Sequence, residues 1–136
     1  MATLNPYLNF RTGTREVMDF YASVFGGDLT SSTFAEAGGM GVDESEQGNI
    51  MHSQLVTTSG MTLMAADVPS SMEVSPNGTI SLSGDDEAEL RGYWDGLSAG
   101  GTPVVPLEKA PWGDTFGMLV DRFGVTWMVN IVGNAG

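Results

Sequence analysis

The side chain best suited to acid–base chemistry in this chain is its single histidine, His52. Imidazole is the only side chain whose ordinary pKa lies near neutrality, so His52 is the natural candidate for a general acid or base. It lies in the run 50–56, which reads as a strand, and alternation along a strand places His52 and Gln54 on the face opposite Leu55. The competing interpretation is a histidine that is only hydrogen-bonded at a sheet face or at a dimer interface.

Trp112 is the second residue whose position stands out. It lies in an Ala-Pro-Trp-Gly-Asp segment, 110–114, that reads as a loop. An indole in such a loop either covers the mouth of a pocket and contacts a ligand, or plugs the end of a core. Both interpretations stay open from the sequence.

The composition excludes several chemistries and partners. The chain has no cysteine, which excludes a thiol nucleophile, a disulfide framework and a thiolate metal site. Its 17 acidic and 5 basic residues give a net charge of −12, which repels polyanions, so nucleic acid and anionic membranes are poor partners. No apolar run approaches the roughly 18 residues that span a bilayer, and the N-terminus lacks the features of a signal peptide. We expect a cytoplasmic protein.

Two helices are predicted, and each ends at a pair of glycines. Thr14 offers an N-cap oxygen to the first helix, and Glu16 lies in its first turn, where the helix dipole favours a carboxylate. Asp85 or Asp86 caps the second helix, with Glu89 placed as in a capping box. The apolar stripes consist of Val17, Tyr21 and Val24 in the first helix and of Leu90, Tyr93 or Trp94, and Leu97 in the second.

Short strands surround these helices. The predicted strands span 4–10, 29–34, 50–56, 61–66, 79–83, 104–105, 116–120 and 125–132. Segment 107–115 is predicted to be a loop. Segment 35–49, with its glycines and acidic residues, is predicted to be a mobile surface loop that is either a lid over a site or plainly disordered.

The two halves of the chain repeat each other. Sliding the sequence by 64 positions places 52–64 on 116–128 and pairs identical residues, including Gly60 with Gly124 and Met64 with Met128. The glycines that end the helices repeat with an offset of 74. The sequence therefore predicts a single α+β domain made of two β-α-β-β-β modules, about 1–68 and 74–132. Together they would form a curved mixed sheet with helices outside and a concave surface inside.

Three motifs resemble a known family. They are Asp-Phe-Tyr-x-x-Val-Phe-Gly-Gly at 19–27, Met-His-Ser-Gln-Leu at 51–55, and Trp-Gly-Asp-x-Phe-Gly-x-Leu-x-Asp-x-Phe-Gly-Val-x-Trp at 112–127. With the duplicated β-α-β-β-β order, they are similar to the vicinal oxygen chelate superfamily, the glyoxalase/bleomycin-resistance/dioxygenase fold, and most of all to its PhnB-like branch. Arg122 departs from the branch, which has proline after the aspartate.

The resemblance implies a position for a metal, but the residues at that position are poor ligands. Metal-dependent members of the superfamily bind a divalent ion through His, Gln or Glu side chains from the first and last strands of each module. The corresponding residues here are Pro6, Met64, Thr79 and Met128. None is a good donor for a hard or borderline cation. We therefore predict no bound Zn²⁺, Ni²⁺ or Fe²⁺, no other cofactor, and neither glyoxalase I nor dioxygenase activity.

The same alignment predicts that two methionines line the floor of a pocket. A thioether adapts to irregular apolar ligands, and Trp127, next to Met128, would then pack beneath the helices as a core residue. The alternative is a filled core without a cavity. The predicted ligand-binding residues are Met64, Met128, Trp112, Thr62, Thr126 and Asn130.

Three functions remain open from the sequence. The first is a metal-independent protein that binds a small apolar or amphipathic molecule, similar to the sequestering resistance proteins of the fold. The second is a lyase or isomerase with His52 as its acid or base. The third is a structural or regulatory dimer without a pocket. A homodimer is expected by resemblance, and the methyltransferase label of part of the PhnB-like branch finds no support, because the chain has no Gly-rich strand-to-helix cofactor loop.

Overall fold

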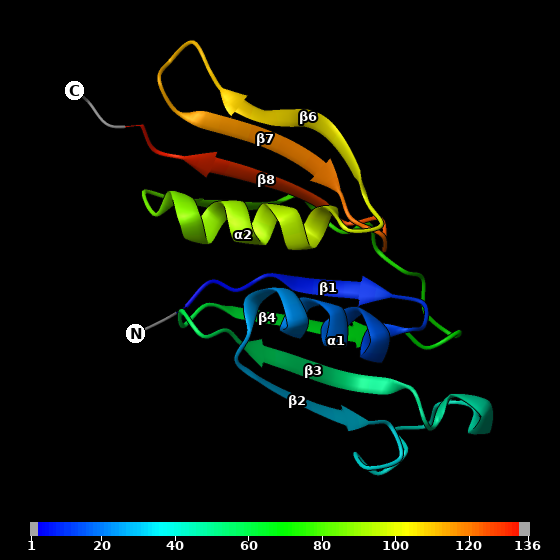
Figure 1. The fold of residues 1–136 in the computed structure, drawn as a ribbon. Helices are drawn as coiled ribbons and strands as arrows, with labels where there is room; N and C mark the ends of the chain where they lie inside the picture. Colours follow the sequence, from blue (N-terminus) through cyan, green and yellow to red (C-terminus); the bar gives the residue numbers. More distant parts are fainter. Residues whose placement is uncertain (1–2, 134–136) are drawn as a thin grey trace. The chain divides into compact units, whose positions relative to one another are not determined.

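The structure, a computed structural model, describes residues 3–133 and divides into two compact units, Met1–Asn77 and Gly78–Gly136. Each unit contains one α-helix and a four-stranded mixed sheet of its own (Figure 1). The α+β class and the duplicated β-α-β-β-β order predicted from the sequence are confirmed.

The first unit contains one α-helix, one short 3₁₀ helix and four strands. The elements are β1 (Tyr7–Phe10), α1 (Thr14–Phe25), β2 (Asp28–Thr33), η1 (Glu44–Glu46), β3 (Ile50–Val56) and β4 (Thr62–Asp67). Its sheet has the order β1-β4-β3-β2, with β1 parallel to β4 and the other neighbours antiparallel. The free edge of β1 is held by Asn77, whose amide accepts from the backbone N–H of Asn9 at 2.8 Å and donates to its carbonyl at 3.0 Å.

The second unit repeats the arrangement of the first. Its elements are β5 (Ile80–Gly84), α2 (Glu87–Ser98), β6 (Thr102–Lys109), β7 (Thr115–Val120) and β8 (Thr126–Ile131). The sheet order is β5-β8-β7-β6, again with one parallel pair, β5 with β8. In each unit the first two strands run parallel, and the helix forms the connection between them. The helix therefore packs on one face of the sheet.

The repeat extends to individual backbone hydrogen bonds. In the β3–β4 turn, Thr57 N–H donates to the Met61 carbonyl at 2.8 Å, and in the β7–β8 turn Asp121 N–H donates to the Val125 carbonyl, also at 2.8 Å. Both pairs are related by the offset of 64. The sequence repeat is therefore a repeat of turn geometry as well as of residue type.

Each turn is also contacted by the glycine that follows its helix. A Cβ added at Gly27 would lie 2.0 Å from the carbonyl oxygen of Val56, and one at Gly101 would lie 2.6 Å from that of Val120. Only a residue without a Cβ permits this approach, because the opposing atoms belong to the backbone and cannot turn away. The glycine pair therefore fixes where each helix returns to its sheet.

The buried faces of the helices agree with the predicted stripes, with one difference. The buried residues of α1 are Thr14, Val17, Met18, Tyr21 and Phe25, and those of α2 are Leu90, Tyr93 and Leu97. Val24, expected in the first stripe, is only half-buried. Trp127 is 1% exposed, which confirms it as a core residue, and its indole N–H donates to Asp121 Oδ2 at 2.9 Å.

The expected N-cap of the first helix is wrong. Thr14 is already inside α1, and its hydroxyl is buried without a hydrogen-bond partner among residues 3–133. The cap comes from Asp67 at the end of β4, whose Oδ1 accepts from Thr14 N–H at 3.0 Å and whose Oδ2 accepts from Ile50 N–H at 2.8 Å. Asp67 is 4% exposed, so a distant buried carboxylate replaces the local hydroxyl.

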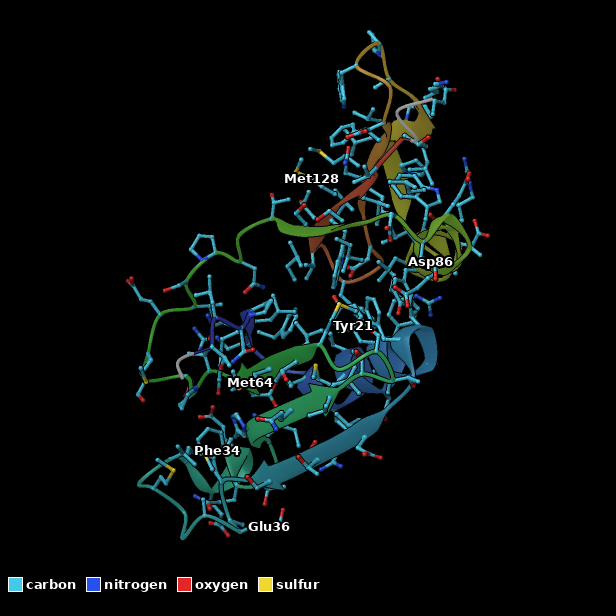
Figure 2. The ribbon with its side chains drawn as sticks, turned by 90° about the vertical axis from the view of Figure 1, so that its left-hand side faces the viewer. Tyr21, Phe34, Glu36, Met64, Asp86 and Met128 are labelled. Carbon is cyan, nitrogen blue, oxygen red and sulfur yellow. The ribbon has the colours of Figure 1, made fainter. Side chains whose placement is uncertain are left out.

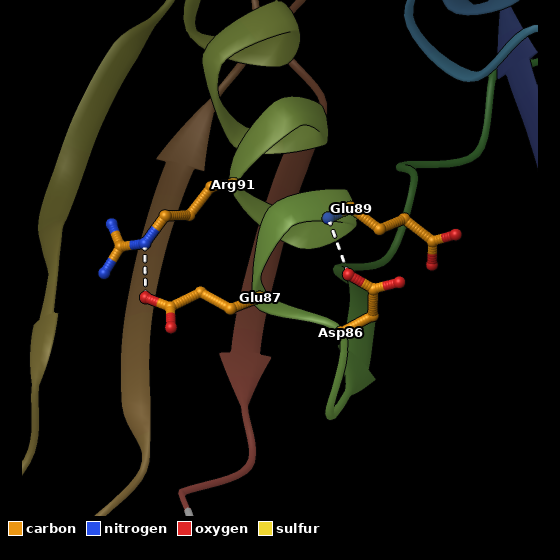
Figure 3. A network of polar contacts seen from close by, with 4 residues as sticks. All are labelled: Asp86, Glu87, Glu89 and Arg91. Carbon is orange, nitrogen blue, oxygen red and sulfur yellow. Dashed lines mark hydrogen bonds and ion pairs between the residues drawn. The ribbon is translucent and has the colours of Figure 1, made fainter.

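The predicted cap of the second helix is confirmed. Asp86 Oδ1 accepts from Glu89 N–H at 3.0 Å (Figure 3). One turn further, Arg91 pairs with Glu87 at 2.7 Å. Both partners of this pair are exposed, so it contributes only about 0.3–0.5 kcal/mol to stability. The Asp86 cap has the larger effect on where α2 begins.

Strand β6 is longer than the predicted strand 104–105, and the predicted loop 107–115 is correspondingly shorter. In the sequence, Pro103 and Pro106 argue against a continuous strand here. In the structure β6 is the edge strand of its sheet, and its register shifts between Pro103 and Val105 and between Val105 and Glu108. Proline is tolerated at an edge and at such irregularities, because no ladder partner requires its missing N–H.

One of the two alternatives predicted for segment 35–49 was plain disorder. The structure differs from it, because part of the segment has regular structure. The 3₁₀ helix η1 lies within it, and the Gln47 side-chain amide donates to the carbonyls of Gly39 and Val42 at 3.1 and 2.9 Å. Glycines 38, 39 and 41 have positive φ angles, which turns require. Phe34, at the start of the segment, is 5% exposed, and Glu36 follows in the first turn (Figure 2). Whether the segment covers a site stays a prediction.

The contact between the second glycine pair and its turn predicts opposite effects for two alanine substitutions. Gly101→Ala should lower the free energy of unfolding by about 1–3 kcal/mol, because the new methyl group overlaps backbone atoms of Val120 and Asp121. Gly92→Ala is the matched control: Gly92 lies in α2 with open space around it, and the change should raise stability by about 0.5–1 kcal/mol. Urea unfolding measures both. Equal effects would contradict the proposed contact.

Candidate functional site

Each sheet has one face covered by its helix and one open face. In the first unit the register places Tyr7 of β1, Met64 of β4, Gln54 of β3 and Thr30 of β2 side by side, one from each strand. Leu55 and Ser53, which alternate with Gln54, are buried. Met64 lies on the side of its sheet away from α1, as Figure 2 shows.

His52 is paired with Tyr7 on this open face. The Tyr7 hydroxyl lies 3.2 Å from His52 Nδ1, and the two ring centroids are 5.8 Å apart. The two residues come from β1 and β3, with β4 between them. On β4, Ala66 shares the face of Met64 and is too small to separate the rings. Burial raises the pKa of the Tyr7 phenol, so its hydroxyl stays protonated at neutral pH.

A shallow hollow of about 180 Å³ lies beside His52, towards the free edge of the sheet. It is lined by Thr30, Ser31, Ser32 and His52. Hydroxyl groups and an imidazole can donate or accept hydrogen bonds, so the hollow is suited to a small polar group rather than to an apolar one. The prediction that His52 and Gln54 share one face of the sheet is thus confirmed, and the residues that line the hollow are polar.

The open face of the second unit differs, because it carries a cluster of methionine and aromatic side chains. Met128 of β8 lies opposite Met118 of β7, and Asn130 lies opposite Phe116. Trp112 packs against Phe116 with ring centroids 6.2 Å apart, and its side chain is 65% exposed. Met128 lies on the side of its sheet away from α2 (Figure 2).

The predicted ligand-binding residues are therefore divided between two faces. Trp112, Thr126, Met128 and Asn130 belong to the open face of the second unit, whereas Thr62 and Met64 belong to that of the first. The exposure of Trp112 disagrees with the interpretation of this indole as a core plug. Binding by any of the six residues stays a prediction.

Asn130 already has a structural partner. Its amide donates to Asp114 Oδ2 at 3.0 Å, and Asp114 Oδ1 accepts from Gly133 N–H at 2.9 Å. The hydrogen bond from Gly133, followed by that from Asn130, lowers the pKa of the Asp114 carboxyl from its ordinary value of 3.8. Asp114 thus joins the Trp112 loop to the end of β8, which positions the indole.

The residues at the superfamily's metal position do not fit a divalent ion. Met64 and Met128 offer only thioethers, and the register places Tyr7 rather than Pro6 beside Met64, and Ser81 rather than Thr79 beside Met128. A neutral phenol and a hydroxyl are no better than the residues expected from the sequence. Within residues 3–133, no three His, Cys, Asp or Glu side chains come together as a metal site. We derive no metal-dependent step.

Sequence reasoning missed Tyr7, Phe116 and Met118. The last two could have been found, because the tight β7–β8 turn fixes the antiparallel register that pairs Met118 with Met128. Tyr7 could not, because its position depends on the parallel pairing of β1 with β4, which no local pattern records.

The comparisons with known proteins agree with this architecture. A sequence model of the family described as 3-demethylubiquinone-9 3-methyltransferase matches residues 2–130. The chain belongs to this family. Protein PA1353 from Pseudomonas aeruginosa shares 34% identity, with a TM-score of 0.82 over 98% of this chain and 100% of that one. Protein YjdN of Escherichia coli is 28% identical over 95% of each chain.

More distant solved structures share the fold. A PhnB protein from Bacillus cereus shares 24% identity, with a TM-score of 0.70 over 96% of this chain and 100% of its own. A glyoxalase/bleomycin resistance/dioxygenase superfamily member from Sphaerobacter thermophilus shares 19%, with a TM-score of 0.62 over 97% and 98%. The fold predicted from the resemblance is confirmed, and the PhnB protein carries the same methyltransferase description as the matching family.

The family's description implies a methyl donor, which the described residues do not fit. The connections from β1 to α1 and from β5 to α2, residues 11–13 and 85–86, are not Gly-rich cofactor loops. The helix N-termini are occupied by the carboxylates of Asp67 and Asp86, and their first turns are acidic. We derive no methyl-transfer step. No helix in 3–133 has the length and apolar character needed to cross a membrane.

The lowered pKa of Asp114 predicts a pH-dependent contribution to stability. The contribution is present above the ordinary carboxyl pKa of 3.8 and is lost as the pH falls through the lowered folded-state pKa. Asp114→Asn should therefore lower the urea midpoint of unfolding near neutral pH. On acidification that midpoint should fall less in the variant than in wild type. Asp95→Asn, an exposed carboxyl in α2 without a hydrogen bond to described residues, is the control. Parallel acid profiles for Asp114→Asn and wild type would contradict the assignment.

Proposed function

We propose that this chain is a metal-independent protein that binds a small apolar or amphipathic molecule on the open face of its second unit. The observation that supports the proposal is the exposed Trp112 indole held against Phe116 beside the methionine pair of β7 and β8. Ligand sites combine aromatic and apolar walls with a few polar groups. Here Thr126 and the carbonyl oxygen of the Asn130 amide supply such groups.

The fixed loop geometry supports binding rather than simple exposure. Asp114 accepts from both Asn130 and Gly133, so the loop that carries Trp112 is anchored at the end of β8. A preorganised aromatic side chain loses little conformational entropy on binding. The ligand should be neutral or cationic, because the chain's net charge of −12 repels anions.

The second candidate is a lyase or isomerase with His52 as acid or base. The observation that favours it is the Tyr7–His52 pair, since a base oriented by a hydrogen-bonded partner is a common catalytic arrangement. The pair is a single contact at 3.2 Å, whereas the second unit combines an exposed indole, an aromatic partner and an anchored loop. Binding on the second unit is therefore the better supported of the two.

Removal of the indole should weaken binding of a neutral apolar probe. With N-phenyl-1-naphthylamine, followed by its fluorescence, Trp112→Ala should raise Kd about five-fold or more, which corresponds to about 1 kcal/mol of lost stacking. Trp112→Phe should keep most of the affinity, because it keeps an aromatic ring next to Phe116.

Met72→Ala is the matched control, since Met72 is an apolar side chain of similar exposure, 60%, in the first unit. It should leave Kd unchanged. A probe that binds Trp112→Ala and Met128→Ala as tightly as it binds wild type would contradict the proposed face. The absence of any rise in melting temperature across a broad library of neutral apolar compounds would favour a structural dimer instead.

A further inference from the structure

The open face of the first unit presents hydrogen-bonding groups that the protein itself does not use. His52 Nδ1 is occupied by Tyr7, but His52 Nε2 has no partner among residues 3–133. The hydroxyls of Thr30 and Ser32, which line the same hollow, also have none in that range. The Ser31 hydroxyl differs, because it is bonded to the Ser53 hydroxyl at 2.9 Å.

The Tyr7 contact determines which nitrogen of His52 carries the proton. In a phenol–imidazole pair the phenol is the stronger acid and the imidazole nitrogen the stronger base, so Tyr7 O–H donates and Nδ1 accepts. A neutral imidazole whose Nδ1 accepts must carry its hydrogen on Nε2. Burial raises the pKa of the Tyr7 phenol, which keeps this donor protonated.

The geometry points to a second binding site on the first unit. We propose that Tyr7 holds His52 in the Nε2–H tautomer, and that this N–H, with the Thr30 and Ser32 hydroxyls, binds the carbonyl oxygen of a small neutral molecule. The register supports convergence, because Ser32 of β2 lies directly opposite His52 of β3, and Thr30 lies opposite Gln54 on the same face.

The size and composition of the hollow limit its ligand. About 180 Å³ accommodates a small polar group but not a large apolar skeleton. All three protein groups can donate hydrogen bonds, and an oxygen with two lone pairs accepts from more than one of them. The hollow and its reporter group, His52, belong to the first unit, whereas Trp112 belongs to the second.

The single histidine makes the test direct, because every imidazole signal comes from His52. Long-range ¹H–¹⁵N spectra of ¹⁵N-histidine-labelled protein, at about pH 8 and so above the ordinary imidazole pKa of about 6.5, distinguish the two tautomers. Wild type should show Nε2 protonated and Nδ1 unprotonated. Tyr7→Phe, which removes only the hydroxyl, should shift the signals towards a mixture. An Nδ1–H tautomer in wild type would overturn the proposal.

Titration with acetate and, separately, acetamide then tests the binding step. Acetamide should move the Nε2 signal along a saturating curve, whereas acetate, which the chain's net charge of −12 repels, should bind more weakly. Saturation by acetate alone would overturn the assignment of a neutral ligand. Thr30→Val and Ser32→Ala should each raise the apparent Kd about three-fold or more, since each removes one hydrogen bond to the ligand. Ser71→Ala, an exposed serine without a hydrogen bond to described residues, should not change it.

Free N-acetylhistidine, titrated in parallel, reports the effect of bulk solvent on an imidazole. If the His52 signals only follow those of N-acetylhistidine with both probes, the site does not exist as proposed. Unchanged Kd values in both hydroxyl variants would likewise overturn the assignment of Thr30 and Ser32. Neither result bears on the binding of apolar probes near Trp112.

Discussion

The close approach of a glycine backbone to a hairpin turn sets the geometry of both units. Gly27 against Val56 and Gly101 against Val120 leave no room for a Cβ, so each helix ends at a fixed distance from the turn that joins the last two strands. Once the helix is held there, one face of the sheet is buried beneath it. Side-chain alternation then decides which residues are left on the other face. The Tyr7–His52 pair and the Trp112 cluster are both consequences of that division.

Acidic residues serve two different purposes in this chain. Most are exposed and give it a strongly negative surface, which limits the charge of any ligand. Asp67 and Asp121 are buried, at 4% and 3% exposure, and each accepts hydrogen bonds from backbone N–H groups that would otherwise lack partners. Buried carboxylates that are fully hydrogen-bonded in this way specify local backbone geometry. The count of charges therefore does not describe their function.

Local patterns in the sequence predicted the features that local physics determines. The helix stripes, the Asp86 cap and the tight turns depend on residues close in the chain, and apart from Val24 they agree with the structure. The features that were wrong or missed depend on distant partners. Asp67 caps a helix that begins 53 residues before it, and Tyr7 meets a histidine 45 residues away across an intervening strand. The length of strand β6 was underestimated, because prolines argue against a strand in the sequence but are tolerated at the edge of a sheet.

The buried hydrogen bond between Asp121 and Trp127 shows how the two halves have diverged. At the equivalent positions of the first unit stand Thr57 and Leu63, and the Thr57 hydroxyl accepts from Met61 N–H just as Asp121 accepts from Val125 N–H. A hydroxyl is sufficient for the turn alone, but only a carboxylate has a second oxygen for the indole N–H. Positions 121 and 127 are therefore coupled: replacing either residue alone by its first-unit counterpart, Asp121→Thr or Trp127→Leu, removes the hydrogen bond between the carboxylate and the indole.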